Sequence, residues 1–275
     1  MKPFSYEAPN SVDKAVALLA SEGKRVRPLA GGTDLLVQLR QGRFEVDLLV
    51  DLKHIAELTT IAYDPVEGLT VGAEVSCAIL SEHNDVRLHY PGLLDAASII
   101  GGTAIQGRAT LGGNLCNAAP SGDSIAAMIV LDAKAVVAGP SGWREEPIAT
   151  FCTAPGKTVL RKGELVVALK FPVPQPYTGA RYVRFIPRGE MDIAVAGAGA
   201  WVRLSPDGTR LEDARIALSA VAPTPLAVPA AAAMVTGQAP EDSAYTRAAE
   251  IAAATATPID DTRGTAAQRR HLVAV

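Results

Sequence analysis

Two segments of the sequence place a pair of glycines between an aliphatic residue and a polar side chain. They read Ala30-Gly31-Gly32-Thr33-Asp34 and Thr110-Leu111-Gly112-Gly113-Asn114. Because glycine tolerates positive φ angles, each segment can turn several backbone N–H groups toward one point, which suits an anion. Two such loops from different subdomains could grip a pyrophosphate from both sides without any lysine. A single glycine pair is more often an ordinary turn, so this prediction depends on the two loops together.

The cysteines and histidines lack the spacing of a metal site or of a disulfide framework. Cys77, Cys116 and Cys152 are scattered along the chain, whereas an iron–sulfur cluster needs four thiolates. The four histidines include no pair spaced for one helical turn, which argues against zinc. We therefore expect free thiols, and neither a metal ligand nor a catalytic side chain in this sequence.

The first glycine loop is expected in a small strand–helix unit at the N-terminal end. Apolar residues recur on one face from Ser11 to Ala20, with Ser11 as N-cap, which predicts an amphipathic helix. A strand over Val26–Ala30 runs into the glycines, and a helix over Asp34–Arg40 follows them. A strand over Val46–Asp51 completes a predicted subdomain of about residues 1–55.

A second predicted subdomain, about residues 56–176, contains the second glycine loop. Its predicted strands and helices are two strands between Leu58 and Val71, helices at Ser76–Glu82, Leu93–Ile100 and Ser124–Leu131, and strands at Ala135–Ala138 and Leu165–Phe171. The glycine-dense stretch 101–114 is predicted to be a loop. Pro172, Pro174 and Pro176 form a stiff connector, where we place a domain boundary.

Residues 177–275 are predicted to form a C-terminal domain. Its expected elements are three antiparallel strands, Ala180–Ile186, Ile193–Leu204 and Ala214–Val221, and helices at Pro225–Thr236, Ser243–Ala254 and from Thr265 onward. The predicted fold class is therefore α+β, with a two-subdomain domain over residues 1–176 followed by a small three-stranded antiparallel sheet with helices.

Composition narrows the class of protein further. With 275 residues, of which 48% are apolar, the chain can bury a substantial core. A net charge of -3 with both signs interspersed provides no basic face for nucleic acid or for an anionic membrane. The start of the sequence lacks an apolar signal core, and no later stretch is long enough to span a bilayer. We therefore expect a cytoplasmic protein without membrane insertion.

The two loops, together with the run from Thr110 to Asp123, resemble the FAD-binding medium subunits of molybdenum hydroxylases. This family includes the flavin domain of xanthine dehydrogenase and the carbon monoxide dehydrogenase flavoprotein, and the resemblance covers nearly the whole chain. It implies an FAD-binding domain of the PCMH type, followed by a domain like the C-terminal domain of the carbon monoxide dehydrogenase flavoprotein. Relatives that attach FAD covalently carry a histidine in the glycine loops, whereas Thr33 stands here. The resemblance thus implies noncovalent FAD.

The resemblance also assigns residues to the cofactor. These are Leu29, Ala30, Gly31, Gly32, Thr33, Asp34 and Leu35 in the first loop, Thr110, Leu111, Gly112, Gly113 and Asn114 in the second, and Ile100, Asp123, Asp192 and Ile193 outside them. Asp123 would accept hydrogen bonds from a ribose or ribityl hydroxyl, or else be a solvated helix cap. Asp192 and Ile193 would lie near the isoalloxazine, although Ile193 could equally be a core position of its strand. Ile100 would pack on FAD or belong to a helix core.

The same resemblance implies partners. A small subunit with two iron–sulfur clusters and a large molybdopterin subunit would accompany this chain, arranged as a dimer of heterotrimers. Electrons would reach FAD from the clusters and leave to NAD, a quinone or oxygen. Two rival interpretations are a self-contained flavin oxidase of the vanillyl-alcohol type and a non-enzymatic nucleotide-binding module. A C-terminal domain of under a hundred residues, poor in aromatic and histidine side chains, argues against the oxidase.

Overall fold

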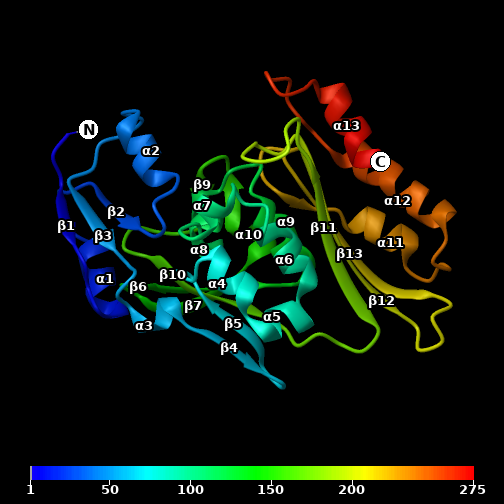
Figure 1. Ribbon diagram of the computed structural model, residues 1–275, viewed down its shortest axis with the longest axis horizontal. Coiled ribbons are helices and arrows are strands. Elements are labelled where there is room, and N and C mark those ends of the chain that lie inside the picture. The colour runs from blue at the N-terminus through cyan, green and yellow to red at the C-terminus, as the bar shows by residue number, and fades with distance from the viewer. Residues whose placement is uncertain (1) are drawn as a thin grey trace.

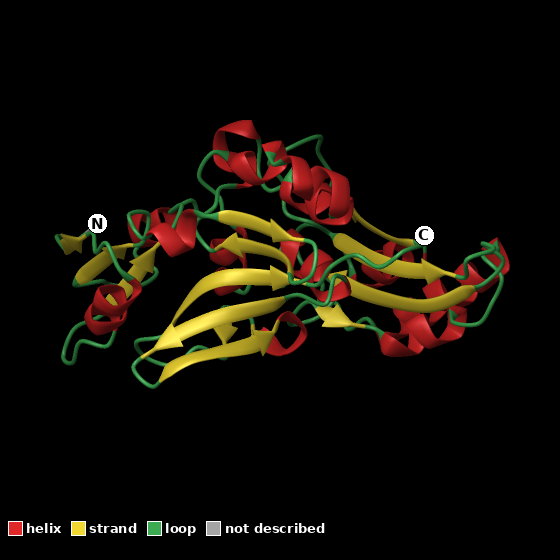
Figure 2. Ribbon diagram, turned by 90° about the horizontal axis from the view of Figure 1, so that it is seen from below, coloured by secondary structure: helices red, strands yellow, loops and turns green. Residues whose placement is uncertain are grey.

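The computed structural model describes residues 2–275, which are arranged around three main β-sheets. The sheets follow one another from the N-terminal to the C-terminal end of the molecule (Figure 1). Figure 2 shows the N-terminal strands at one end, the largest sheet in the middle and the C-terminal strands at the other end. The α+β fold class predicted from the sequence is confirmed.

The N-terminal subdomain is a parallel sheet with two helices. Its elements are β1 (Ser5–Glu7), α1 (Val12–Leu19), β2 (Val26–Leu29), α2 (Leu35–Arg40) and β3 (Leu48–Asp51). Ser11 caps α1, because its Oγ accepts a hydrogen bond from the N–H of Lys14. The strand order is β1-β3-β2, with Leu29 opposite Asp51. Since the carboxyl ends of parallel strands share one edge, the segments that follow β2 and β3 meet there.

The second subdomain is built on an antiparallel sheet of order β4-β5-β10-β6-β7. Its strands are β4 (Ile61–Asp64), β5 (Gly68–Gly72), β6 (Lys134–Gly139), β7 (Gly142–Pro147) and β10 (Leu165–Phe171), beside a short pair, β8 (Cys152–Ala154) and β9 (Lys157–Thr158). Its helices are α3 (Ala56–Thr59), α4 (Cys77–Glu82), α5 (Asn84–His89), α6 (Pro91–Ala97), α7 (Thr103–Gln106), α8 (Leu111–Asn117), α9 (Asp123–Val130) and α10 (Ile148–Phe151).

The stretch 101–114 differs from its prediction as a loop. α7 and the first half of α8 lie within it, and the pair Gly112-Gly113 is helical. Glycine has a low helix propensity, so sequence alone disfavours a helix at this position. The packing requires glycine here, because a Cβ at Gly112 would come within 2.6 Å of the Ala73 Cβ.

The C-terminal domain is an antiparallel sheet of order β11-β12-β13-β14 with helices on both faces. Its elements are β11 (Thr178–Phe185), β12 (Ala196–Leu204), β13 (Leu211–Ser219), β14 (Leu226–Ala227), α11 (Pro229–Val235), α12 (Asp242–Thr255) and α13 (Ala266–Ala274). The predicted three strands are present, and the short β14 adds a fourth. Helices α11, α12 and α13 cover one face, and α6 and α9 pack against the other. Within residues 2–275, every helix falls short of the length and apolar character that crossing a bilayer requires.

One hydrophobic core runs across the connector between the two parts of the chain. Tyr182, Trp201 and Ala217 of the C-terminal sheet are buried in the same cluster as the side chains of α9 and the five-stranded sheet. The guanidinium of Arg215 lies 4.0 Å from the centre of the Trp201 ring, and its Nη1 donates to the carbonyl of Val130 at 2.9 Å. The two parts therefore share packing as well as a covalent link.

Candidate functional site

The two glycine segments lie against each other, although residues 35–109 separate them in the sequence. A Cβ on Gly31 would overlap the carbonyl oxygen of Arg108 and come within 2.5 Å of its carbonyl carbon. A Cβ on Gly113 would lie 3.7 Å from the Cβ of Ala30. The backbone of the first loop therefore touches the chain just before α8, and only glycine at position 31 permits that approach. The two loops lie close enough to face one ligand.

The backbone conformations differ from the expected pair of positive-φ turns. Gly32 has a φ of +80°, which puts it in the left-handed region. Gly112 and Gly113 instead occupy the first turn of α8, where Thr110 is the N-cap and its Oγ1 accepts from the N–H of Gly113 at 2.9 Å. The expectation of positive φ is thus wrong for the second segment, which is a capped helix start.

Several backbone N–H groups of the first loop are free to bind a ligand. Across residues 2–275, the amides of Gly31, Gly32, Thr33 and Asp34 find no acceptor in the protein. Thr33 is half-buried, and Asp34 stands at the N-cap of α2 without a capping bond from its side chain within the described chain. Unpaired amides in a turn suit an anion with several oxygens, such as a diphosphate.

Leu29 and Leu35, at the two ends of the first loop, pack into the hydrophobic core of the N-terminal sheet. Leu29 is buried with Leu39, Val46 and Leu49, and Leu35 packs against the same cluster from a half-buried position. These two predicted site residues therefore act in the structure as apolar anchors at the ends of the loop. Full burial of a leucine side chain such as Leu29 contributes about 1.5–3 kcal/mol.

A charged group that the sequence interpretation missed lies beside the first loop. Lys53 Nζ donates to the carbonyl of Ala30 at 3.3 Å and pairs with Asp51 Oδ1 at 2.5 Å. Asp51 is buried, and its Oδ2 accepts a hydrogen bond from Tyr6 Oη at 2.5 Å. Lys53 thus binds the backbone of the loop and a neighbouring carboxylate, so the prediction that the amides hold a diphosphate without a lysine stays a prediction. The sequence pattern could have indicated this contact. Lys53 follows β3, the glycine loop follows β2, and the two strands are parallel neighbours, so their carboxyl ends lie together.

Asn114 and Asp123 occupy the two helices next to the loops. Asn114 Oδ1 accepts from Ser124 Oγ at 2.7 Å, which ties α8 to α9. Asp123 is 7% exposed and lies in the first turn of α9, so the alternative of a solvated helix cap is wrong. Its Oδ1 accepts from Tyr182 Oη at 2.8 Å, and its Oδ2 forms an ion pair with Arg184.

Burial and the neighbouring charge act in opposite directions on the pKa of Asp123. Burial raises the pKa of Asp123, and the neighbouring Arg184 opposes that shift. Arg184 also donates through Nη2 to the carbonyl of Ile99 at 2.8 Å, and Tyr182 Oη lies 2.9 Å from Ser219 Oγ. In this structure Asp123 therefore joins α9 to the C-terminal sheet.

Ile100, Asp192 and Ile193 lie around a second group of contacts. Ile100 comes after the end of α6 and is half-buried at the edge of the core, so its assignment to a helix core is wrong. Ile193 precedes β12 and is 46% exposed, which contradicts its alternative as a strand core position. The segments that carry them approach each other, since a Cβ on Gly102 would lie 3.2 Å from Met191 Sδ.

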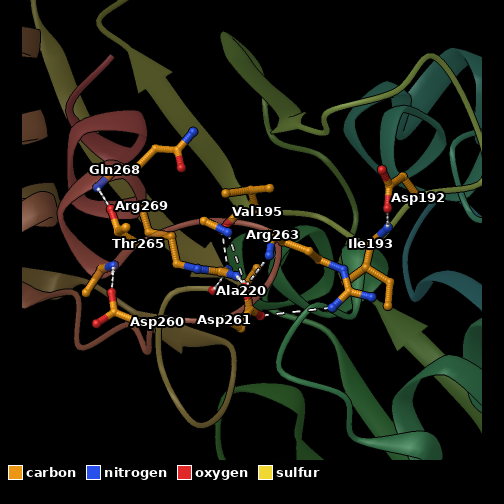
Figure 3. Close-up of polar contacts among 12 residues, drawn as sticks. Asp192, Ile193, Val195, Ala220, Asp260, Asp261, Arg263, Thr265, Gln268 and Arg269 are labelled. Carbon is orange, nitrogen blue, oxygen red and sulfur yellow. Dashed lines mark hydrogen bonds and ion pairs between the residues drawn. The ribbon is translucent and has the colours of Figure 1, made fainter.

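Figure 3 shows how the C-terminal helix holds the segment after Ile193. Arg269 is 4% exposed and donates through Nη1 to the carbonyls of Val195 and Ala220, at 2.7 and 2.9 Å. Its Nη2 donates to Asp261 Oδ1 at 2.8 Å. Asp192 accepts hydrogen bonds from Arg188 Nε and from the Ile193 N–H, and these contacts lower the pKa of Asp192.

The predicted residues thus fall into three places. The two loops form one contact, Asp123 joins α9 to β11, and Met191, which precedes Asp192 and Ile193, lies over Gly102. The segment Ile99–Gly102 connects the place around Asp123 with the place around Met191, because Arg184 donates to the Ile99 carbonyl and Met191 lies beside Gly102. What the first loop offers a ligand is mostly backbone amide, and the second place adds a buried carboxylate.

Comparisons with known proteins agree on one family. The family model for the FAD binding domain in molybdopterin dehydrogenase matches residues 2–174, and the model for the CO dehydrogenase flavoprotein C-terminal domain matches residues 181–275. The xanthine dehydrogenase FAD-binding subunit of Escherichia coli O157:H7 is 37% identical over 224 residues, which cover 81% of this chain and 75% of the relative. The carbon monoxide dehydrogenase medium chain of Hydrogenophaga pseudoflava is 32% identical, with 96% and 90% covered.

Solved structures give the same result. Carbon monoxide dehydrogenase from Hydrogenophaga pseudoflava, in a form that lacks the Mo-pyranopterin moiety of the molybdenum cofactor, superposes with a TM-score of 0.95 at 33% identity. The superposition covers 100% of this chain and 95% of that one.

Proposed function

This chain belongs to the FAD-binding subunits of the molybdopterin dehydrogenases, and on that premise we propose that it binds FAD between its two glycine segments and transfers electrons within a molybdenum hydroxylase. The observation that carries the site is the contact of Gly31 with the Arg108 carbonyl, which brings the free amides of the first loop next to the start of α8. Bound FAD would supply a group that accepts and releases electrons.

The residues of the chain would divide the binding between them. The amides of Gly31 to Asp34 and of Gly112 would hold the diphosphate, with Leu29, Leu35 and Leu111 fixing the backbone that presents them. Asp123 would accept from a hydroxyl of the cofactor with the acceptor capacity that Tyr182 and Arg184 leave. Ile100 and the Asp192–Ile193 segment would line the ring, and the histidine-free loops support noncovalent binding.

The family supports a larger assembly. The relatives are medium chains and FAD-binding subunits, which supports partner subunits for this chain. We propose that a small iron–sulfur subunit delivers electrons and that a large molybdopterin subunit determines the substrate, in a cytoplasmic dimer of heterotrimers. The boundary between the FAD-binding and C-terminal domains is proposed at residue 176. Full-length similarity to subunits of multi-subunit dehydrogenases argues against a self-contained flavin oxidase and against a non-enzymatic module.

The purified chain provides the test. We expect it to be yellow, or to become so when mixed with FAD, and to release intact FAD in warm acid. A preparation that stays colourless after FAD is added would refute the cofactor site. Co-purification from the native source should recover molybdenum and iron in partner chains. Reduction of the isolated flavoprotein by a small alcohol, without any partner, would instead favour the oxidase.

A further inference from the structure

Glu74 is a buried acidic side chain outside the cofactor contacts described above. It lies just after β5, is 8% exposed, and its Oε2 has no hydrogen-bond partner among residues 2–275. Its backbone N–H donates to the Leu58 carbonyl at 2.7 Å, which fixes the turn that carries it. An unpaired, buried carboxyl oxygen is costly, so it needs a reason in the chemistry of its surroundings.

The surroundings of Glu74 belong to the two loops. Its neighbour Ala73 packs directly against Gly112, where a Cβ would come within 2.6 Å of the Ala73 carbonyl oxygen. Arg108, whose carbonyl meets the first loop at Gly31, is close enough to act on the Glu74 carboxyl. The turn that carries Glu74 therefore packs against the start of α8, directly after Arg108, which contacts the first loop.

Four titratable or charged groups face Glu74 from the elements packed around it. They are Asp51 and Lys53 after β3, Arg108 before α8, and Cys116 in α8. Lys53 already pairs with Asp51 at 2.5 Å, so its charge is only partly available to Glu74. Burial therefore dominates and raises the pKa of Glu74 to about 8, whereas the pKa of Cys116 is raised to about 12. Near neutral pH the Glu74 carboxyl carries its proton.

We propose that neutral Glu74 is a positioning residue of the diphosphate site, and that its ionisation weakens the binding of the anionic cofactor; this rests on the proposed function. A neutral carboxyl adds no charge behind the loops and leaves Lys53 free to hold the Ala30 carbonyl. An ionised carboxyl would place a negative charge, in a poorly solvated position, near a ligand that is itself negative. Cofactor binding and loss of the Glu74 proton therefore oppose each other.

The test is the pH dependence of FAD binding to the full chain, followed by quenching of flavin fluorescence between pH 6.5 and 9. The dissociation constant of the wild type should be constant below about pH 7 and should rise by up to about tenfold per pH unit above pH 8. Glu74→Gln stays neutral at every pH, so its dissociation constant should remain at the low-pH value of the wild type. Glu57→Gln removes an exposed carboxylate in α3 and should follow the wild type.

A second variant keeps the proposal falsifiable if Glu74→Gln fails to fold. Lys53→Gln removes a cation that favours the ionised form of Glu74, so the pH at which binding weakens should move upward. Equal pH profiles in the wild type and Glu74→Gln, or an unmoved midpoint in Lys53→Gln, would overturn the inference while leaving the FAD site in place. A failure of the wild type to bind FAD at pH 6.5 would overturn the proposed function itself.

Discussion

Replacing Gly31 by alanine tests the contact between the two loops most directly. The φ of Gly31 lies outside the left-handed region, so its backbone accepts an alanine without conformational strain. The added methyl group instead meets the chain at Arg108, where it would lie 2.5 Å from the carbonyl carbon. Carbon atoms in van der Waals contact are separated by about 3.5–4.0 Å, and the Arg108 carbonyl oxygen lies nearer still, so the two segments must move apart by at least about 1 Å.

A movement of that size is enough to disrupt an amide cradle. A hydrogen bond of about 2.9 Å stretched by about 1 Å is no longer a hydrogen bond. Hydrogen bonds to a charged group contribute about 1.5–3 kcal/mol each, so losing two costs about 3–6 kcal/mol. The dissociation constant for FAD should therefore rise by about 10²- to 10⁴-fold in Gly31→Ala.

The assay is a titration of the apoprotein with FAD, with thermal unfolding measured alongside to show that the variant is folded. Gly107→Ala is the matched control, because a Cβ there would point into open space in the same region of the chain. This control should bind FAD like the wild type. Binding by Gly31→Ala within about threefold of the wild type would refute the reasoning, since about 0.7 kcal/mol is too little for a lost hydrogen bond.

Three further predictions concern stability. Asp123→Ala leaves the buried Arg184 guanidinium without its carboxylate and should lower the free energy of unfolding in urea by about 3–5 kcal/mol; a loss below 1 kcal/mol would contradict this. Arg269→Gln removes the guanidinium donors to the carbonyls of Val195 and Ala220 and to Asp261, and it should lower the free energy of unfolding in urea by about 2–4 kcal/mol. An unchanged urea midpoint would show that these hydrogen bonds do not stabilise the fold. The pKa of Glu74 is raised from 4.5, its value in the unfolded chain, to about 8 in the folded protein. The protonated Glu74 carboxyl therefore contributes its full stability below pH 4.5, and this contribution is lost as the pH rises to 8. The free energy of unfolding should fall across that window by at most about 1.4 kcal/mol per pH unit, and Glu74→Gln should remove this slope.

Local patterns in the sequence predicted much of the fold. Periodicity and residues that favour helix starts predicted the cap at Ser11, a strand over Val46–Asp51 and a helix over Ser124–Leu131. The cap is present, the strand is observed at Leu48–Asp51, and the helix is observed at Asp123–Val130. The contact between the two glycine segments could not come from such patterns, because residues 31 and 108 meet only in the folded chain. Family resemblance supplied that pairing, and the structure supplies its physical reason at Gly31.

Tertiary contacts explain what the sequence could not indicate. Asp123 finds its partners 59 and 61 residues away on β11, and no spacing rule connects an aspartate to residues at such separations. Position 112 is glycine because Ala73 leaves no room for a side chain, and the residue lies in a helix although its propensity favours a turn. Glu74 is an ordinary acidic residue in the sequence, and only its burial reveals it.

The shared core across the proline connector changes how the chain responds to cleavage. A protease that cuts between Pro172 and Pro176 would remove the covalent link but not the packing of Tyr182, Trp201 and Ala217 beneath α9. Nicked protein should therefore migrate as one particle on a sizing column and fall into two fragments only in detergent. Expression of either half alone would leave a broad apolar face in water, so each half depends on the other as a subunit depends on its partner.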